Sequence, residues 1–445
     1  MGPALIEDRT AGGTGRVFIA RRHDIVREIL ATDTIFSLRH YDDRLDQIAN
    51  GARYFVSDDQ PGRDRRLVKL AAAQAYVEKL IGAGPIPRGA PYLDWIAAIA
   101  RDEAQRAAAI LHQRQGPPQP FNFIRDYVFI VTYRAAARVF GVAMPERMPL
   151  LVLIYMLLRT LVADRSWPHP SGQSTAATTL VALMHAPFGF VFNPGRNSNY
   201  ILKLIARASA EKCLSIINSA IDRPDLAPPA SLLAALLADA PPPAGQDRAD
   251  IRSILFEFAG AIGLIASRTT ADIAALLTKP EAASSVGIDW ATVAARLRTS
   301  TAGDSHAIMN ELVRLTANTK LSRTVRTGVD FHGIALDADD WIILDIAAAS
   351  RDPHVFASPD RFNPDPARPI IAFGPTDGKH ACYGQFIART LIREMILVAD
   401  EWFEPCPGTA LEVLGELPDA MAWRCRPQRR DFICATEVAR ASAAF

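Results

Sequence analysis

The 445-residue chain lacks the features that mark several protein classes. Its cysteines, Cys213, Cys382, Cys406, Cys425 and Cys434, form no CxxC pair, so neither a zinc site nor a secreted disulfide framework is indicated. Its 49 basic and 48 acidic residues leave a net charge of +1, so nucleic acid is not an expected partner. The overall composition, 49% hydrophobic and 22% charged residues, indicates a globular protein with a large core.

Long hydrophobic runs are also missing. The N-terminal sequence MGPALIEDRTAGGTGR has no signal-peptide pattern, and the longest apolar run, Leu150 to Leu158, is about half of the roughly 20 residues that span a bilayer. We therefore expect a cytoplasmic protein without a transmembrane anchor. The apolar run itself is a core segment, or a greasy entrance for a lipid-like substrate.

The hydrophobic pattern predicts a mainly α-helical protein with a small β region, an α+β fold. Helical periodicity covers residues 24–31, 67–77, 93–111, 123–142, 148–162, 178–192, 251–277, 305–318 and 385–403. Strand-like segments occur at 16–20 and then late, at 321–327, 329–336, 341–349, 410–415 and 421–428. No internal repeat divides the chain, so we expect a single domain over residues 1–445.

One glycine-rich loop carries the chemistry that the sequence predicts most directly. In FGPTDGKHACYGQFI (373–387), Gly378 and Gly384 bracket Cys382, and an apolar helix follows. Such glycines allow a close backbone approach, and the start of a helix favours a thiolate over a thiol. A thiolate at this place is the ligand that a haem iron needs, so Cys382 is the expected metal ligand.

Three separate motifs together resemble the cytochrome P450 family. Glu311 and Arg314 look like its ExxR pair, and PDRF looks like the motif whose arginine, here Arg361, completes a charged triad. The third motif is GxxxCxG, matched by the glycines and cysteine of the 373–387 loop. The resemblance covers most of the chain, in the family's order and nearly its spacing.

This resemblance implies the cytochrome P450 fold, with haem b between the long central helix and the helix after the cysteine. Cys382 is then the axial thiolate, while His380 and Arg323 hold the haem propionates. Arg63 is a further expected partner, although it stands where the family usually has histidine.

The chain departs from the family pattern at three places. The usual phenylalanine seven residues before the cysteine is Pro375, and Phe373 stands two residues early. The central helix has Arg268 and Thr269 where an acid and a threonine are expected, and arginine cannot relay protons near neutral pH. The chain also begins close to the family's early strands, without its usual first helix.

The register of the central helix allows a second alignment. The earlier pair Ala259 and Gly260 could face the haem instead, which would place Gly263 at the threonine position. The two alignments assign different residues to the reaction centre. In the first, Arg268 and Thr269 are the catalytic candidates.

Three functions are consistent with these motifs. The first is a monooxygenase that oxidises a hydrophobic small molecule with electrons from a separate ferredoxin or flavin reductase. The second is a peroxide-dependent fatty-acid hydroxylase or a hydroperoxide-rearranging enzyme, because similar enzymes have an arginine that pairs with the substrate carboxylate, as Arg268 would. The third is a non-catalytic haem-binding or haem-less recruitment module.

Overall fold

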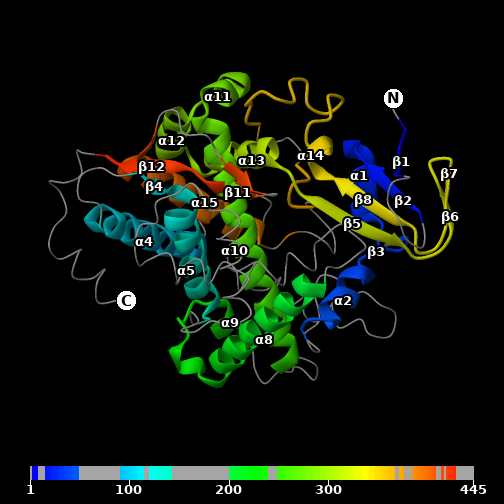
Figure 1. Ribbon diagram of the computed structural model, residues 1–445, viewed down its shortest axis with the longest axis horizontal. Helices are drawn as coiled ribbons and strands as arrows, with labels where there is room; N and C mark the ends of the chain where they lie inside the picture. Colours follow the sequence, from blue (N-terminus) through cyan, green and yellow to red (C-terminus); the bar gives the residue numbers. More distant parts are fainter. Residues whose placement is uncertain are drawn as a thin grey trace.

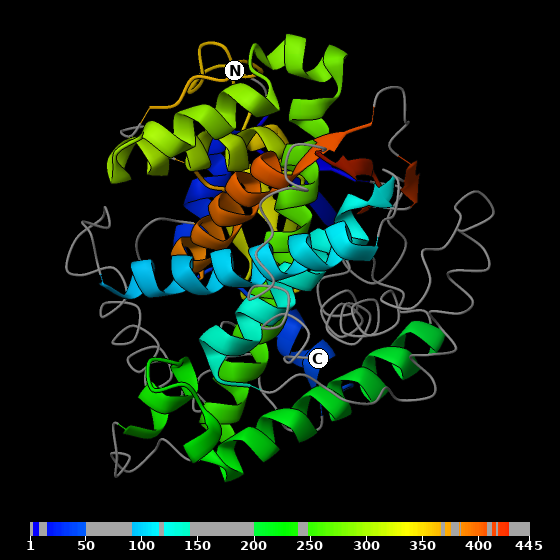
Figure 2. The ribbon, with the colours of Figure 1, turned by 90° about the vertical axis from the view of Figure 1, so that its left-hand side faces the viewer.

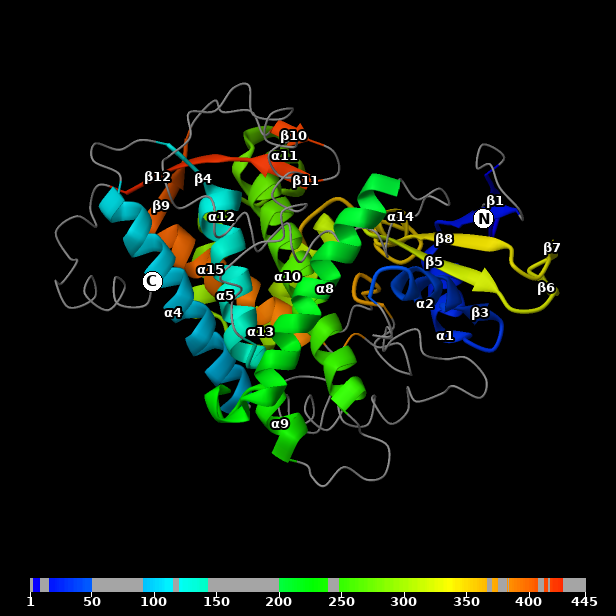
Figure 3. The same ribbon diagram turned by 60° about the horizontal axis from the view of Figure 1, so that its bottom comes forward.

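The computed structural model describes residues 3–8, 16–49, 91–114, 120–142, 200–238, 248–365, 370–374, 382, 384–406, 412–414 and 417–426. The helices expected at 67–77, 148–162 and 178–192 lie outside these residues. Within them, helices form the body of the molecule and a small sheet lies to one side (Figure 1; Figure 3). This confirms the predicted mainly helical fold with a small β region.

Helices dominate the described part of the chain (Figure 1). They are α1 (His23–Ala31), α2 (Arg39–Asp46), α4 (Pro91–Arg114), α5 (Phe129–Phe140), α8 (Tyr200–Asp222), α9 (Leu232–Ala238), α10 (Arg248–Thr278), α11 (Pro280–Val286), α12 (Trp290–Thr299), α13 (Ala302–Thr316), α14 (Ile346–Ala349) and α15 (Gln385–Trp402). A π-helical turn, η1 (Ile124–Val128), leads into α5, and a 3-10 turn, η2 (Pro224–Leu226), follows α8.

Local signals in the sequence set several helix ends. The Asp289 side chain accepts a hydrogen bond from the Thr292 N–H at the start of α12 (2.8 Å), and Thr301 caps α13 in the same way. Both supply an acceptor for an N–H that has no partner inside the helix. Helices α5 and α11 end at Gly141 and Gly287, with φ of 74° and 78°, a left-handed conformation that glycine adopts without steric cost.

The main sheet joins strands near the N-terminus to strands between residues 320 and 345. Its strand order is β1-β2-β8-β5-β3, and β2 runs parallel to β8 while the other pairs are antiparallel. The strands are β1 (Ile6–Glu7), β2 (Val17–Ala20), β3 (Phe36–Ser37), β5 (Lys320–Val325) and β8 (Trp341–Asp345). Figure 3 shows α1 and α2 beside this sheet, away from the helical body.

Three smaller sheets complete the described strands. Strands β4 (Phe121–Asn122) and β9 (Phe403–Pro405) pair with β12 (Ala422–Cys425), which ties the end of α15 to the start of α5. The other two are hairpins: β6 (Val329–Phe331) with β7 (Ile334–Leu336), and β10 (Glu412–Leu414) with β11 (Leu417–Ala420).

One predicted strand ends earlier than its sequence suggests. Residues 341–349 were expected to be extended throughout, but β8 stops at Asp345 and residues 346–349 form α14. The Asp345 carboxylate accepts a hydrogen bond from the Ala348 N–H (3.0 Å). This side-chain cap, followed by alanines, favours a helical turn over a strand.

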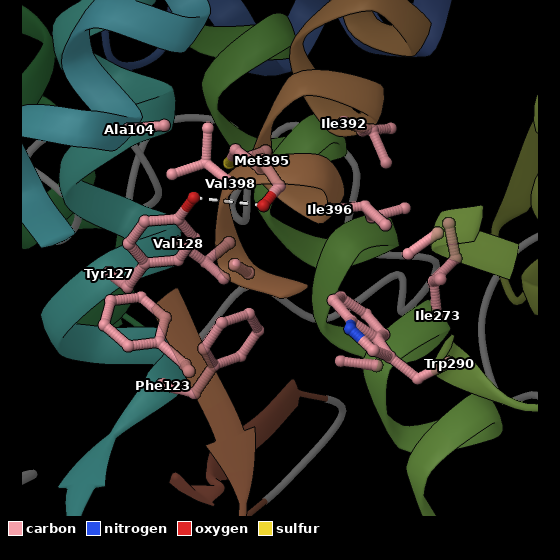
Figure 4. Close-up of a cluster of buried hydrophobic side chains, with 14 of the residues drawn as sticks. Ala104, Phe123, Tyr127, Val128, Ile273, Trp290, Ile392, Met395, Ile396 and Val398 are labelled. Carbon is pink, nitrogen blue, oxygen red and sulfur yellow. Dashed lines mark hydrogen bonds between the residues drawn. The ribbon is translucent and has the colours of Figure 1, made fainter. Parts of the chain in front are cut away.

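The main core packs α15 against α4, α10 and η1 (Figure 2; Figure 4). In Figure 4 the Tyr127 hydroxyl donates a hydrogen bond to the Met395 carbonyl oxygen (3.0 Å), while Phe123 and Trp290 lie nearby. Phe123 also stacks on Trp423 of β12, with ring centroids 4.1 Å apart. These buried contacts fix the helix that follows Cys382.

Helix α10 runs through the middle of the molecule (Figure 1; Figure 3). It crosses α5 closely, because a side chain at Gly263 would overlap the Tyr133 ring. One face of its C-terminal half is only partly covered: Ile265 is 40% exposed, and Ala261, Arg268, Thr269 and Asp272 along the same face are partly buried.

The segment Ile251–Thr278 of α10 is the single described helix that is long and apolar enough to cross a bilayer. However, 73% of its apolar window is buried inside the protein. That burial is typical of a core helix.

Candidate functional site

Cys382 lies immediately before α15, as the sequence predicted. The backbone N–H groups of Gly384 and Gln385, at the start of this helix, hydrogen-bond to the sulfur and favour its charged form. Burial has the larger effect and raises the pKa of Cys382 to about 11. Without a cationic partner such as a metal ion, this cysteine is therefore a thiol at neutral pH.

The same helix carries a buried arginine, Arg389, whose charge acts on that of Cys382. Arg389 is 5% exposed and lies between Phe373 and Phe386, with its guanidinium carbon 4.8 and 5.5 Å from the two ring centroids. Its Nη2 donates a hydrogen bond to Gln385 Oε1 (2.9 Å), but Nε and Nη1 have no hydrogen-bond partner. Burial lowers the pKa of Arg389 to about 10, and the charge of Cys382 acts in the opposite direction.

Helix α10 meets the cysteine loop at Ile262. The Ile262 Cδ1 atom lies 2.8 Å, and the Cys382 sulfur 4.0 Å, from the point where a Cβ at Gly384 would stand. Gly384 therefore provides space for the isoleucine, and any larger residue would separate α10 from the loop. Arg268 is six residues further on, about 9 Å along the helix axis. The contact favours the second alignment, in which Gly263 is at the threonine position.

Arg268 and Thr269 lie on the partly exposed face of α10. Arg268 Nε donates to Asp272 Oδ2 (3.2 Å), and the Asn318 amide donates to the same oxygen (2.7 Å). Burial raises the pKa of Asp272, whereas Arg268 and Asn318 act to lower it. The guanidinium charge is thus already balanced within the helix.

The ExxR pair is fully buried and fully bonded. Arg314 and Glu311 form two parallel hydrogen bonds, of 2.8 and 2.9 Å, and are 0% and 2% exposed. Arg314 Nη1 also donates to the carbonyl oxygens of Ser350 (2.8 Å) and Pro359 (2.7 Å). The pair therefore joins α13 to the segment that leads toward the cysteine loop.

The expected charged triad with Arg361 does not form through its side chain. Arg361 meets the pair through its carbonyl oxygen, 3.4 Å from Arg314 Nη2. Its guanidinium instead donates to the carbonyl oxygens of Ser284 (3.4 Å) and Ser285 (3.2 Å) at the end of α11. Helix ends attract cations, and Glu311 already accepts from Arg314 and from a backbone N–H.

Arg323 belongs to a buried polar cluster between β5 and α2. It is 4% exposed and donates to the Ser322 carbonyl oxygen (2.8 Å). The Ser322 hydroxyl lies 2.7 Å from His40 Nε2 and 3.1 Å from the Tyr41 hydroxyl. Burial, together with the charges of Arg323 and Arg44, holds the pKa of His40 well below its usual value. Two permanent positive charges therefore lie beside a neutral histidine.

The remaining predicted site residues lie outside the described part of the chain. These are Arg63, Gly378 and His380, together with Pro375 in the altered loop. Within the described residues, no group of three or more His, Cys, Asp or Glu side chains could hold a metal ion by itself.

A sequence model of the cytochrome P450 family matches residues 305–397, which include the ExxR pair and Cys382. Over these residues the chain is similar to the cytochrome P450 family. It is 35% identical over 105 residues to biflaviolin synthase CYP158A1 of Streptomyces coelicolor, a match that spans 23% of this chain and 24% of that protein.

Three solved structures share the fold over nearly the whole chain. CYP109E1 of Bacillus megaterium, without substrate, gives a TM-score of 0.62 at 14% identity, covering 95% of each chain. The haem domain of CYP116B5 of Acinetobacter radioresistens gives 0.64 at 14% identity, covering 95% of this chain and 92% of the other. CalO2 gives 0.64 at 16% identity, covering 93% and 92%.

Members of this family bind haem b through a cysteine thiolate, and Cys382 is the matching cysteine. The described residues fit this cofactor: two backbone N–H groups point at the sulfur, and buried guanidinium nitrogens beside it lack hydrogen-bond partners. Cys382 would hold the iron.

Two residues of this site were missed from sequence. The signal for Arg389 was present, because it shares a helix face with Ile392 and Ile396, and an arginine among buried apolar residues is unusual. Ile262 carried no such signal, since isoleucine is ordinary in an apolar helix.

Proposed function

We propose that this protein is a haem-thiolate monooxygenase that inserts one oxygen atom into a hydrophobic small molecule. The observation that carries the proposal is the setting of Cys382 at the start of α15, where the backbone N–H groups of Gly384 and Gln385 and the charge of Arg389 favour the charged form of its sulfur. In the overall reaction, substrate, dioxygen, two electrons and two protons give the hydroxylated product and water. The bound haem supplies the oxygen activation. A separate ferredoxin or flavin reductase supplies the electrons, and residues 1–445 act as one haem domain in the cytoplasm.

The residues of α10 next to the sulfur give this enzyme an apolar centre. Ile262 and Gly263 cannot donate a proton, and Ile262 excludes water from its contact with Gly384. The partly exposed face of α10, with Ile265 at its middle, offers apolar contact for the substrate.

Spectra and turnover test this proposal in sequence. The reduced protein with carbon monoxide should have the red-shifted Soret band of thiolate ligation, and Cys382→Ala should lose it. Purified protein with a ferredoxin, a reductase and NADPH should then hydroxylate members of a hydrophobic substrate panel. An unchanged haem spectrum in Cys382→Ala would refute the ligand assignment, and haem-free protein would support the recruitment module.

Peroxide-dependent oxidation is the second candidate, favoured by the absence of an acid at Ile262 and Gly263. Hydrogen peroxide brings both the oxygen atom and the two electrons, so that substrate and peroxide give product and water without a reductase. Incubation of purified protein with substrate and peroxide alone tests this route. No turnover under these conditions would contradict it.

The ion pair of Arg268 suggests which substrates fit either route. Because Asp272 balances its charge, we expect neutral polar groups to be accepted more readily than a fatty-acid carboxylate. Thr269, on the same face, would contact the substrate through its hydroxyl.

Asp272→Asn should free Arg268 for a substrate carboxylate while keeping the side chain's size. We expect fatty-acid affinity to rise about tenfold, the worth of a hydrogen bond to a charged group. Spectral titration of the haem protein with a fatty acid measures this affinity, and Asp272→Glu, which retains the pair, is the control. An unchanged affinity in Asp272→Asn would remove Arg268 from the substrate site.

A further inference from the structure

We propose that Arg389 is the counter-charge of the Cys382 sulfur, a positioning residue that stabilises the thiolate and sets the reduction potential of the haem iron. The inference rests on the proposed haem-thiolate function and adds a residue to it. The sulfur acts on the iron, and the guanidinium acts through the sulfur.

The geometry of α15 directs Arg389 toward the cysteine. Arg389 is in the second turn of the helix, and helical side chains tilt toward the N-terminus, where Cys382 lies. Its hydrogen bond to Gln385, one turn earlier, confirms this direction. Phe373 and Phe386 hold the planar group from two sides.

The charge balance requires a negative partner. Arg389 is buried, retains its proton at neutral pH, and makes no ion pair with a carboxylate among the described residues. Cys382 is the described group whose charge favours the charged form of Arg389, and the effect is mutual. Glu257 of α10 opposes the thiolate, whereas Arg389 favours it. A buried cation is stabilised when its neighbour becomes an anion.

A purely structural role accounts for the contacts of Arg393, on the same helix, but not for those of Arg389. Arg393, one turn further, is paired with Glu394, and its Nε also donates to Ser305 Oγ (3.0 Å). Glu394 is 0% exposed and also accepts from Arg101. All of these charges are compensated inside the protein. Arg389 has two buried nitrogens without a hydrogen bond, which is how a group looks when its partner forms only in the loaded protein.

The experiment compares Arg389→Met, Arg389→Lys and Arg393→Met in the haem-loaded full chain. Three quantities are measured: the Soret band of the reduced carbon monoxide complex, the reduction potential, and the rate of haem transfer to excess apomyoglobin. Loss of the positive charge in Arg389→Met should lower the potential, reduce the fraction of thiolate-type band, and speed haem transfer about tenfold or more. Lysine should restore much of the potential, because it keeps the charge without the planar stacking.

The control separates charge from stability. Arg393→Met should lower the melting temperature and leave the potential and the band position unchanged. If Arg389→Met does not fold, Arg389→Lys and Arg389→Gln give the same comparison of charged and neutral side chains. Equal potentials in wild type and the neutral variants would overturn the inference. A wild-type protein without the thiolate band would instead overturn the proposed function itself.

Discussion

Two buried arginines on neighbouring helices are held in opposite ways. Arg314 of α13 has a carboxylate and two main-chain carbonyls as close partners, whereas Arg389 of α15 has one amide oxygen, two aromatic rings and a neighbouring sulfur. The first is complete within the chain, and the second is complete only when Cys382 is an anion. The number of partners that a buried charge has in the protein alone therefore separates a structural role from a role in binding a cofactor.

Removing Arg314 should give the largest loss of stability. Arg314→Met leaves Glu311 buried without its bidentate partner, so we expect the free energy of unfolding to fall by about 3–5 kcal/mol. Urea denaturation monitored by circular dichroism measures this. The double variant Glu311→Leu/Arg314→Met should lose less than the single variant, because no charge is left behind. If Arg314→Met is as stable as the wild type, Arg314 does not have the structural role that distinguishes it from Arg389.

The second-largest expected effect is a loss of folding stability at acid pH, through the protonation of His306 near Arg389. Burial and the charge of Arg389 lower the pKa of His306, which stacks on Phe386, to about 4. A lowered histidine pKa contributes stability above its ordinary value of 6.5 that is lost as the pH falls toward 4. Because His306 is partly exposed, we expect a loss of about 1–2 kcal/mol.

His306→Phe tests the origin of this acid sensitivity. It keeps an aromatic ring on Phe386 and cannot be protonated, so its stability should change less between pH 7 and pH 4 in matched urea titrations. If the wild type and this variant have the same pH profile, protonation of His306 is not the cause.

Removing Arg389 from the haem-free protein should have a small effect. Arg389→Met removes a charge that is uncompensated in that state, so we expect the free energy of unfolding to stay within about 1 kcal/mol or to rise. Thermal and urea unfolding of the haem-free protein give the value. If the free energy of unfolding falls as much as in Arg314→Met, Arg389 stabilises the fold and is not a partner of the sulfur.

Arg361 provides the smallest expected effect. Its guanidinium binds the exposed end of α11, so Arg361→Ala should lose only about 0.3–1 kcal/mol, the range of a helix-end charge interaction. Members of a buried triad would lose several times more. Urea titrations beside the Arg314 variant would distinguish these two roles of the PDRF arginine.

Local sequence patterns predicted the order of the helices and strands and the position of Cys382 before a helix. The helix after Cys382 begins at Gln385, as its apolar periodicity and the preceding glycine predicted. The same reasoning failed at 346–349, where one aspartate side chain turns an apolar run into α14. It also failed for Arg361, because both possible partners of that side chain are distant in sequence. Spacing along the chain shows which residues could meet, and packing decides which do.

For the same reason, the sequence alone could not predict which residues of α10 contact the cysteine loop. Arg268 and Ile262 are both compatible with helical periodicity, and only the contact with Gly384 distinguishes them. This contact crosses more than a hundred positions, and an isoleucine resting on a glycine leaves no recognisable motif.

The crossing of α5 and α10 at Gly263 and Tyr133 limits how this protein can change. A threonine at 263 would add a hydroxyl group to the central helix, but its Cβ would overlap the tyrosine ring. Position 133 must therefore become smaller first. Directed evolution toward a proton-donating central helix must therefore change position 133 before position 263. Variants that change only residue 263 should fold only when it remains glycine.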